Sequence, residues 1–189
     1  MGHISERRIL DYKKKHINAL ILASKKEDQQ AQMELYQRYS QNLYYSAYRI
    51  EKNADDALDA VQEGFITAFQ KLDQYQGGGS FEGWLHKIVI RKSIKYYQNN
   101  KHFVNDDFLE NRTELSENQE LTEEHAPRLE KGQLENVLQK LSERYQIILK
   151  LYYLEGYDHQ GISEIMNWSY ANCRTTLSRA REQLKKQLL

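Results

Sequence analysis

The stretch ADDALDAVQEGFITAFQKL, residues 54–72, decides the class of fold. Its apolar residues recur at the i, i+3, i+4, i+7 spacing of an amphipathic α-helix. They predict a buried stripe made of Ala54, Ala57, Leu58, Val61, Phe65, Ala68, Phe69 and Leu72. The same spacing continues in both directions along a chain of 189 residues with one proline and nine glycines. We therefore expect an all-α protein.

The opposite face of this helix has a different character. It carries Asp55, Asp59, Gln62, Glu63, Ile66 and Gln70. An isoleucine framed by acids and amides favours a small contact site for another protein. A single exposed isoleucine without a function is also common, so both interpretations stay open at this point.

Helices are also expected before this stretch, over Ile4–Ser24 and over Asp28–Ile50. The second of these contains five tyrosines, for which we expect a packing role with the hydroxyls reaching water. They are Tyr36, Tyr39, Tyr44, Tyr45 and Tyr48.

A basic helix follows three consecutive glycines, Gly77 to Gly79. Ser80 is its expected N-cap, and a set at helical spacing anchors it: Phe81, Trp84, Leu85 and Ile88. Positive charge then comes from Lys87, Arg91, Lys92, Lys95 and Lys101, interleaved with Tyr96 and Tyr97. Cations that neutralise phosphate and rings that stack on bases are typical of single-strand binding, although a basic helix exposed only to solvent has the same composition.

The formal net charge is zero, but the charges are segregated. The segment from His102 to Glu130 holds nine acidic residues against two basic ones, a net charge of −7, so the remainder carries +7. This acidic, weakly periodic segment contains the only proline, Pro127, and indicates a flexible linker. It is either a solvated loop without a role or a shield for the basic faces. We predict two small helical domains, 1–101 and 131–189, joined by the linker 102–130.

The second domain is predicted to contain four helices. Residues 132–141 and 143–155 are amphipathic, and the segment from Asp158 to Leu188 has the outline of a helix-turn-helix. Asp158 caps a short helix, Asn167 and Trp168 form the turn, and Ser169 caps the longer helix. The inward stripe of that helix is Cys173, Leu177, Ala180 and Leu184, which makes Cys173 a small buried hydrophobe. Its far side offers Ala171, Arg174, Thr175, Ser178 and Arg179 to base edges, with Arg181, Lys185 and Lys186 suited to phosphates.

Several classes of protein are not favoured. The sequence shows no Walker-type glycine motif, no metal-ligand cluster and no nucleophile-base pair, so we expect neither an enzyme nor a cofactor or metal. It also shows no run long enough for membrane insertion and no signal peptide. A single cysteine fits a reducing compartment. Together these features predict a cytoplasmic location.

Two long runs resemble one protein family in the right order. DALDAVQEGFITAFQKLDQYQGGGSFEGWLHKI, residues 56–88, resembles region 2 of bacterial sigma factors of the extracytoplasmic function (ECF) group of the sigma-70 family. LSERYQIILKLYYLEGYDHQGISEIMNWSYANCRTTLSRAREQL, residues 141–184, resembles their region 4, and residues 29–50 resemble the start of region 2.

The resemblance implies a promoter-specificity subunit of RNA polymerase. Asp59, Gln62, Glu63 and Ile66 would contact the clamp helices of the largest polymerase subunit. Trp84, Lys87, Arg91 and Lys95 would bind the melted −10 element, and Arg174, Thr175, Ser178 and Arg179 would read the −35 element of promoter DNA, with Arg181 beside them. The resemblance also implies an anti-sigma factor as a partner.

The chain departs from the family pattern at four positions. Arg91 stands where the family often has asparagine, Lys95 where an acid is frequent, Gly64 where a larger residue is usual, and Gly161 where a helix former is expected. The first two leave open which base is captured. Two other functions remain possible from the sequence: a free-standing helix-turn-helix regulator of duplex DNA, and an interaction adaptor that no longer supports transcription.

Overall fold

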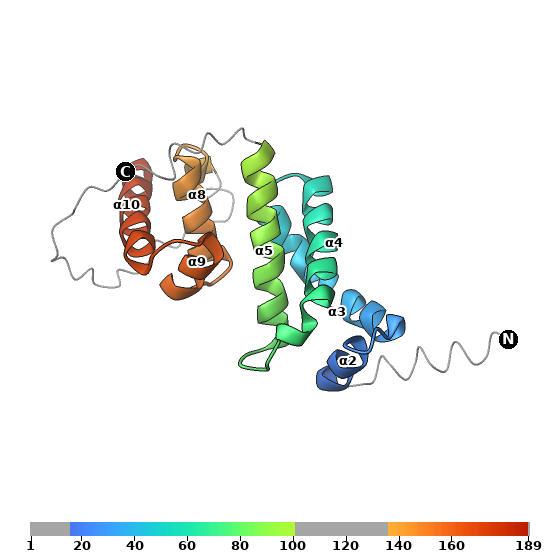
Figure 1. Cartoon of the computed structure of the whole chain (residues 1–189). Helices are drawn as coiled ribbons and strands as arrows, with labels where there is room; N and C mark the ends of the chain where they lie inside the picture. The colour runs from blue at the N-terminus through green and yellow to red at the C-terminus, as the bar shows by residue number, and fades with distance from the viewer. Residues whose placement is uncertain (1–15, 101–135, 189) are drawn as a thin grey trace. The chain divides into compact units, whose positions relative to one another are not determined.

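The computed structural model describes residues 16–100 and 136–188, and all of the regular structure in these ranges is helical (Figure 1). The chain divides into two compact units, and the division follows Lys101. The predicted domain bounds, 1–101 and 131–189, stay a prediction. The predicted linker 102–130 lies outside the described residues.

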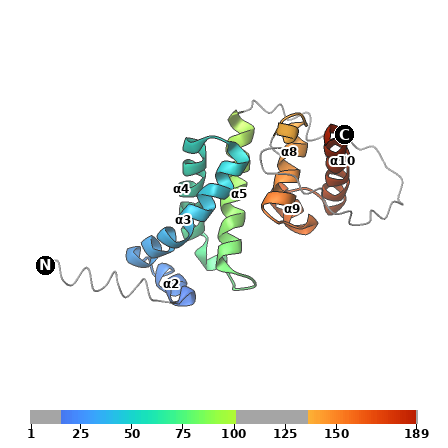
Figure 2. The same cartoon turned by 180° about the vertical axis from the view of Figure 1, so that it is seen from behind.

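The first unit is built around three helices, α3, α4 and α5, which lie side by side in both views (Figures 1 and 2). A short helix, α2, packs against α3. The bounds are α2 Ile17–Ser24, α3 Gln29–Glu51, α4 Ala54–Gln70, the 3-10 turn η1 Leu72–Gln74, and α5 Phe81–Asn100.

Short polar side chains set where these helices begin. The Asp28 carboxylate accepts hydrogen bonds from the backbone N–H groups of Gln30 and Ala31, at 3.0 and 3.1 Å. Asn53 caps α4 in the same way, and the Ser80 hydroxyl accepts from Gly83 N–H at 3.0 Å. These bonds satisfy donors that a helix leaves unpaired in its first turn. The predicted cap at Ser80 is confirmed.

The predicted helix over Ile4–Ser24 is wrong in one respect. His16 has an extended backbone, and its ring accepts a bond from Asn18 N–H at 3.4 Å, so it is the N-cap of a new helix that begins at Ile17. A continuous helix therefore does not pass through His16. The part of the prediction before residue 16 lies outside the described residues.

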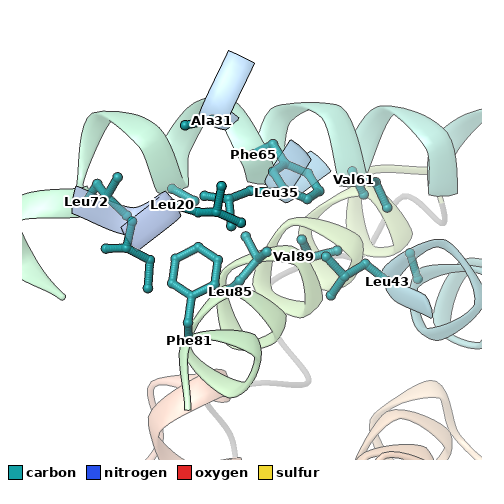
Figure 3. Packing of buried hydrophobic residues seen from close by; sticks show 14 of the residues in the cluster. Leu20, Ala31, Leu35, Leu43, Val61, Phe65, Leu72, Phe81, Leu85 and Val89 are labelled. Carbon is teal, nitrogen blue, oxygen red and sulfur yellow. The ribbon is translucent and has the colours of Figure 1, made fainter. Parts of the chain in front are cut away.

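The core of the first unit lies between α3, α4 and α5, and it includes Leu20 of α2 (Figure 3). Figure 3 labels Leu20, Ala31, Leu35, Leu43, Val61, Phe65, Leu72, Phe81, Leu85 and Val89. Gly64 allows α4 and α5 to approach closely, because a Cβ atom at this position would lie 2.5 Å from Val89 Cγ2. A larger residue at this position would therefore push α4 and α5 apart.

Some predicted core residues are at the surface. Ala54 is exposed because it opens α4, and Leu58 is 42% exposed. Among the tyrosines of α3, Tyr36 packs on Phe65 as expected, but Tyr45 and Tyr48 are 51% and 40% exposed. Helical spacing alone allowed a stripe wider than the neighbouring helices cover.

The second unit is described from residue 136. Residues 136–138 are helical and belong to the predicted helix 132–141, whose first part lies outside the described residues. The predicted helix 143–155 is α8 Glu143–Leu149 followed by a π-helical turn, η2 Lys150–Leu154. The chain continues through α9 His159–Met166 and α10 Tyr170–Leu188.

The predicted helix-turn-helix is confirmed in its local geometry. Asp158 accepts a bond from Gly161 N–H at 2.7 Å and caps α9. Asn167 adopts a left-handed backbone with φ 55°, and Trp168 N–H donates to Ser163 O at 3.0 Å, which closes the helix end. Ser169 then accepts from Asn172 N–H at 3.2 Å and starts α10.

Candidate functional site

The outward side of α4 combines exposed apolar and polar groups. We use the name α4 face for Leu58, Asp59, Gln62, Glu63 and Ile66. Asp59, Gln62 and Glu63 are exposed as predicted, and Ile66 is 57% exposed. Leu58, predicted to be buried, joins them, because Leu58, Gln62 and Ile66 follow one another at intervals of four residues on one side of the helix. Apolar side chains framed by carboxylates and amides suit the surface of a protein partner.

Glu63 is held in place by α5. Tyr96 donates its hydroxyl hydrogen to Glu63 Oε1 at 2.7 Å, and Lys92 Nζ lies 3.0 Å from Oε2. These hydrogen bonds lower the pKa of Glu63, and the first of them raises the pKa of Tyr96 to about 12. The α4 face is thus tied to the helix that carries the candidate single-strand contacts.

An aromatic cluster lies where the glycine loop enters α5. The Tyr75 ring centroid is 5.5 Å from those of both Phe81 and Trp84, and the Phe81 and Trp84 centroids are 5.7 Å apart. The Tyr75 hydroxyl donates to Gly79 O at 2.7 Å. Trp84 is half-buried in this cluster, so it anchors the start of α5. Tyr75 was missed by the sequence analysis, although its position just before the glycines could have drawn attention to it.

The predicted −10 residues share the outer side of α5. Trp84, Lys87, Arg91 and Lys95 follow one another at three- and four-residue intervals and lie opposite the buried Val89 and Ser93. Arg91 and Lys95 are exposed, while Lys87 is partly buried. At Gly78 and Gly79 an added Cβ would meet nothing within 4 Å, so the loop in front of this helix is open. Cations behind an open loop form a surface to which a phosphate backbone can bind.

The two tyrosines near the end of α5 do not present free rings. Tyr97 is only 5% exposed, and Tyr96 is bonded to Glu63. Tyr97 is not available to stack on a base, because it continues the buried stripe of Ile90 and Ile94 at helical spacing.

Helix α10, the second helix of the helix-turn-helix, has the buried side that was predicted. Cys173, Leu177, Ala180 and Leu184 are buried, and burial raises the pKa of the Cys173 thiol. Ala171 and Arg174 are exposed, and Thr175, Ser178 and Arg179 are partly exposed. The predicted −35 residues therefore lie outside the core, on the sides of the helix that a duplex can approach.

Arg144 of α8 fixes the position of α10. Its Nη2 atom donates to Asn172 Oδ1 at 2.9 Å and Thr176 Oγ1 at 3.2 Å, and its guanidinium carbon lies 4.6 Å from the centroid of the Trp168 ring. One side chain thus joins the turn to the first turns of α10. No spacing pattern in the sequence points to Arg144, since the contact joins residues far apart in the chain.

Arg181 has a partner within the protein. Its guanidinium carbon lies 4.4 Å from the Tyr152 ring centroid and 5.8 Å from that of Tyr153. Its predicted place among the −35 contacts stays a prediction, and the structure adds a packing role on η2. His159, which no sequence pattern singled out, contacts the rings of Tyr152 and Tyr170.

Residues 16–100 and 136–188 lack two structural features. Within these ranges no helix is both long and apolar enough to span a bilayer. The same part of the chain holds no group of three or more His, Cys, Asp or Glu side chains arranged to bind a metal ion.

Comparisons with known proteins match this arrangement segment by segment. The profile of sigma-70 region 2 matches residues 35–103, and that of sigma-70 region 4 matches residues 131–184. The chain is 31% identical over 163 residues to RNA polymerase sigma factor YlaC of Bacillus subtilis, covering 82% of this chain and 90% of that protein. It is 29% identical over 175 residues to ECF RNA polymerase sigma factor SigW of the same organism, covering 87% and 92%.

A solved structure shows the same fold. The sigma factor RpoE of Bartonella quintana, crystallised with the anti-sigma factor NepR, superposes with a TM-score of 0.53 at 20% identity, covering 82% of this chain and 95% of that one.

Proposed function

The chain belongs to the ECF group of the sigma-70 family of RNA polymerase sigma factors, which serve in transcription initiation, and we propose that it docks on core polymerase through α4 and recognises promoters at two elements. The observation that carries the proposal is the α4 face, because a protein that only binds duplex DNA has no use for it. Its partner would be the clamp helices of the largest polymerase subunit.

Docking follows from the chemistry of the α4 face. Ile66 and Leu58 supply apolar contact area, and Asp59 offers an exposed carboxylate to a basic partner. Glu63 is held by Tyr96 and Lys92, so its orientation is set before the partner arrives. Binding then costs little conformational entropy at the Glu63 side chain.

The outer side of α5 is the proposed site for the melted −10 strand. A base that leaves the duplex stack loses a few kcal/mol of stacking and pairing, which contacts in a protein recover. The open loop at Gly78 and Gly79 admits the base, and Lys87, Arg91 and Lys95 hold the backbone behind it. Arg91 in place of asparagine makes phosphate binding the main role of that position.

The helix-turn-helix is the proposed −35 reader. Arg174, Thr175, Ser178 and Arg179 supply donors and small groups that fit base edges in the major groove. Arg144 holds Asn172 and Thr176, so the recognition helix approaches the groove as a rigid element.

Other properties follow from this role. We propose that the chain acts by binding, without enzymatic activity, cofactor or metal, and that it works in the cytoplasm, where polymerase is. The solved relative is bound to an anti-sigma factor, which supports an anti-sigma partner for this chain as well.

Run-off transcription with core polymerase and a library of random upstream sequence tests the whole proposal. We expect transcripts from a subset of templates that share two elements, and none from core polymerase alone. A chain that binds duplex DNA but not polymerase would be a free-standing regulator. One that binds polymerase but gives no transcript from any template would be an interaction adaptor.

A further inference from the structure

His159 lies where three elements of the second unit meet. It is the first residue of α9, and its ring centroid is 5.9 Å from that of Tyr152 in η2 and 6.0 Å from that of Tyr170 in α10. The ring is partly exposed, and Tyr170 is 53% exposed. The imidazole thus contacts two tyrosine rings and is still partly exposed to a ligand.

The groups that face His159 disfavour the protonated form of its ring in the free protein. Burial lowers the pKa of His159, and the positive charges of Arg181 and Arg174 on α10 lower it further. Asp158, its neighbour at the start of α9, acts in the opposite direction. Tyr152 and Tyr170 are the other titratable groups in contact with the ring. An anion placed here would cancel the field of the two arginines.

The position of His159 beside α10 indicates which anion would bind there. Tyr170 opens the recognition helix, and Arg174 follows one turn later on its exposed side. A duplex contacted by Arg174 brings its phosphates to the same end of α10, and phosphates are what Tyr hydroxyls and cationic side chains bind in protein–DNA contacts. A neutral imidazole has one donor, whereas the protonated ring has two donors and a full charge.

We propose that His159, together with the Tyr170 hydroxyl, binds a phosphate of the promoter duplex and takes up a proton from solvent as it does so. This inference rests on the proposed −35 function of α10. Its consequence is that duplex binding strengthens as the pH falls toward the pKa of the free ring. Because a phosphate contact carries no base information, the effect extends to duplexes of any sequence.

The test is the pH dependence of duplex affinity, measured by fluorescence anisotropy with the full chain and a labelled duplex of random sequence at constant ionic strength. Uptake of one proton allows at most a tenfold change in affinity per pH unit. We expect the wild-type affinity to rise by about three- to tenfold from about pH 8 to about pH 6 relative to His159→Gln. His86→Gln, which alters a histidine of α5 bonded to Ser46, is the matched control and should keep the wild-type slope.

A second measurement excludes an indirect effect of the substitution. The imidazole NMR titration of His159 should give a pKa below the usual 6.5 in the free protein and a higher pKa in the complex. Equal pH slopes for wild type and His159→Gln, or an unchanged His159 titration on binding, would overturn this proposal while leaving −35 recognition standing. Absence of duplex binding at every pH would overturn both.

Discussion

At the scale of single residues, Glu51 is the most unusual acid among the described residues. Both of its carboxyl oxygens are buried, and burial raises its pKa to about 8, with Asp56 and Asp59 acting in the same direction and the Ser93 hydroxyl against them. Because the folded pKa lies above the ordinary value near 4.5, the folded chain keeps a proton that the unfolded chain releases. The resulting stabilisation is fully present below about pH 4.5 and is lost as the pH rises through about 8.

Glu51→Gln should therefore remove this pH dependence. Glutamine resembles the protonated acid, so we expect the variant to gain about 1 kcal/mol over wild type near pH 9, a value reduced from the full shift because water screens a half-buried group. Thermal unfolding across the pH range measures it, with the exposed Glu82→Gln as control. A variant whose melting temperature follows that of wild type at every pH would show that Glu51 titrates normally.

Gly64 gives the second prediction at this scale. A methyl group at this position would lie 2.5 Å from Val89 Cγ2 and 3.3 Å from Val89 Cα, so α4 and α5 would have to separate. Gly64→Ala should cost about 1 to 3 kcal/mol of unfolding free energy, and Val89→Ala in the same chain should recover part of it. Gly78→Ala, where the methyl group meets nothing, is the control and should leave the melting temperature within a few degrees. If Gly64→Ala leaves the free energy of unfolding unchanged, α4 and α5 are not in close contact at this position.

At the scale of elements, α5 is expected to act on the melted strand. Removing one phosphate contact lowers the salt slope of single-strand binding by about 0.7. Lys95→Ala should show this decrease and should impair promoter opening more on a duplex template than on a premelted one. Permanganate reactivity of unpaired thymines separates the two steps, and Lys71→Ala at the end of α4 is the control. Equal activity of Lys95→Ala on both templates would remove α5 from the opening step.

Helix α10 allows a contrast between its own Arg174 and Arg144 of α8, which contacts it. Arg174 is exposed and points away from the core, so Arg174→Ala should cost about 1 to 3 kcal/mol at a preferred −35 site and relax the sequence preference, with little change in melting temperature. Arg144 donates a hydrogen bond to Asn172 of α10 and packs on the Trp168 ring. Arg144→Ala should therefore lower both the melting temperature and the affinity for all DNA sequences. An equal loss on every sequence for Arg174→Ala would make Arg174 a phosphate contact.

At the scale of the whole molecule, the sequence predicted what depends on local chemistry. The caps at Ser80, Asp158 and Ser169 and the buried stripe of α10 were found because each involves residues within a few positions of one another. Contacts between different helices could not be predicted from the sequence. Leu58, Tyr97 and Arg144 have environments set by a neighbouring helix, and no spacing rule within one helix reports which side that neighbour covers.

The central claim for the whole molecule is that the α4 face binds core polymerase. Ile66 is 57% exposed, so Ile66→Ala should keep the melting temperature within a few degrees, and the exposed Asp59 should likewise tolerate reversal to lysine. Leu22→Ala on α2 removes an equally exposed side chain, 60% accessible, and is the matched control.

Equilibrium affinity for core polymerase, measured for these three variants beside wild type, is the most direct test. We predict a loss of at least about tenfold, or about 1.4 kcal/mol, for Ile66→Ala and for Asp59→Lys, with the second effect shrinking at high salt and Leu22→Ala unchanged. Folded Ile66→Ala and Asp59→Lys proteins that bind core polymerase as tightly as wild type would contradict the account.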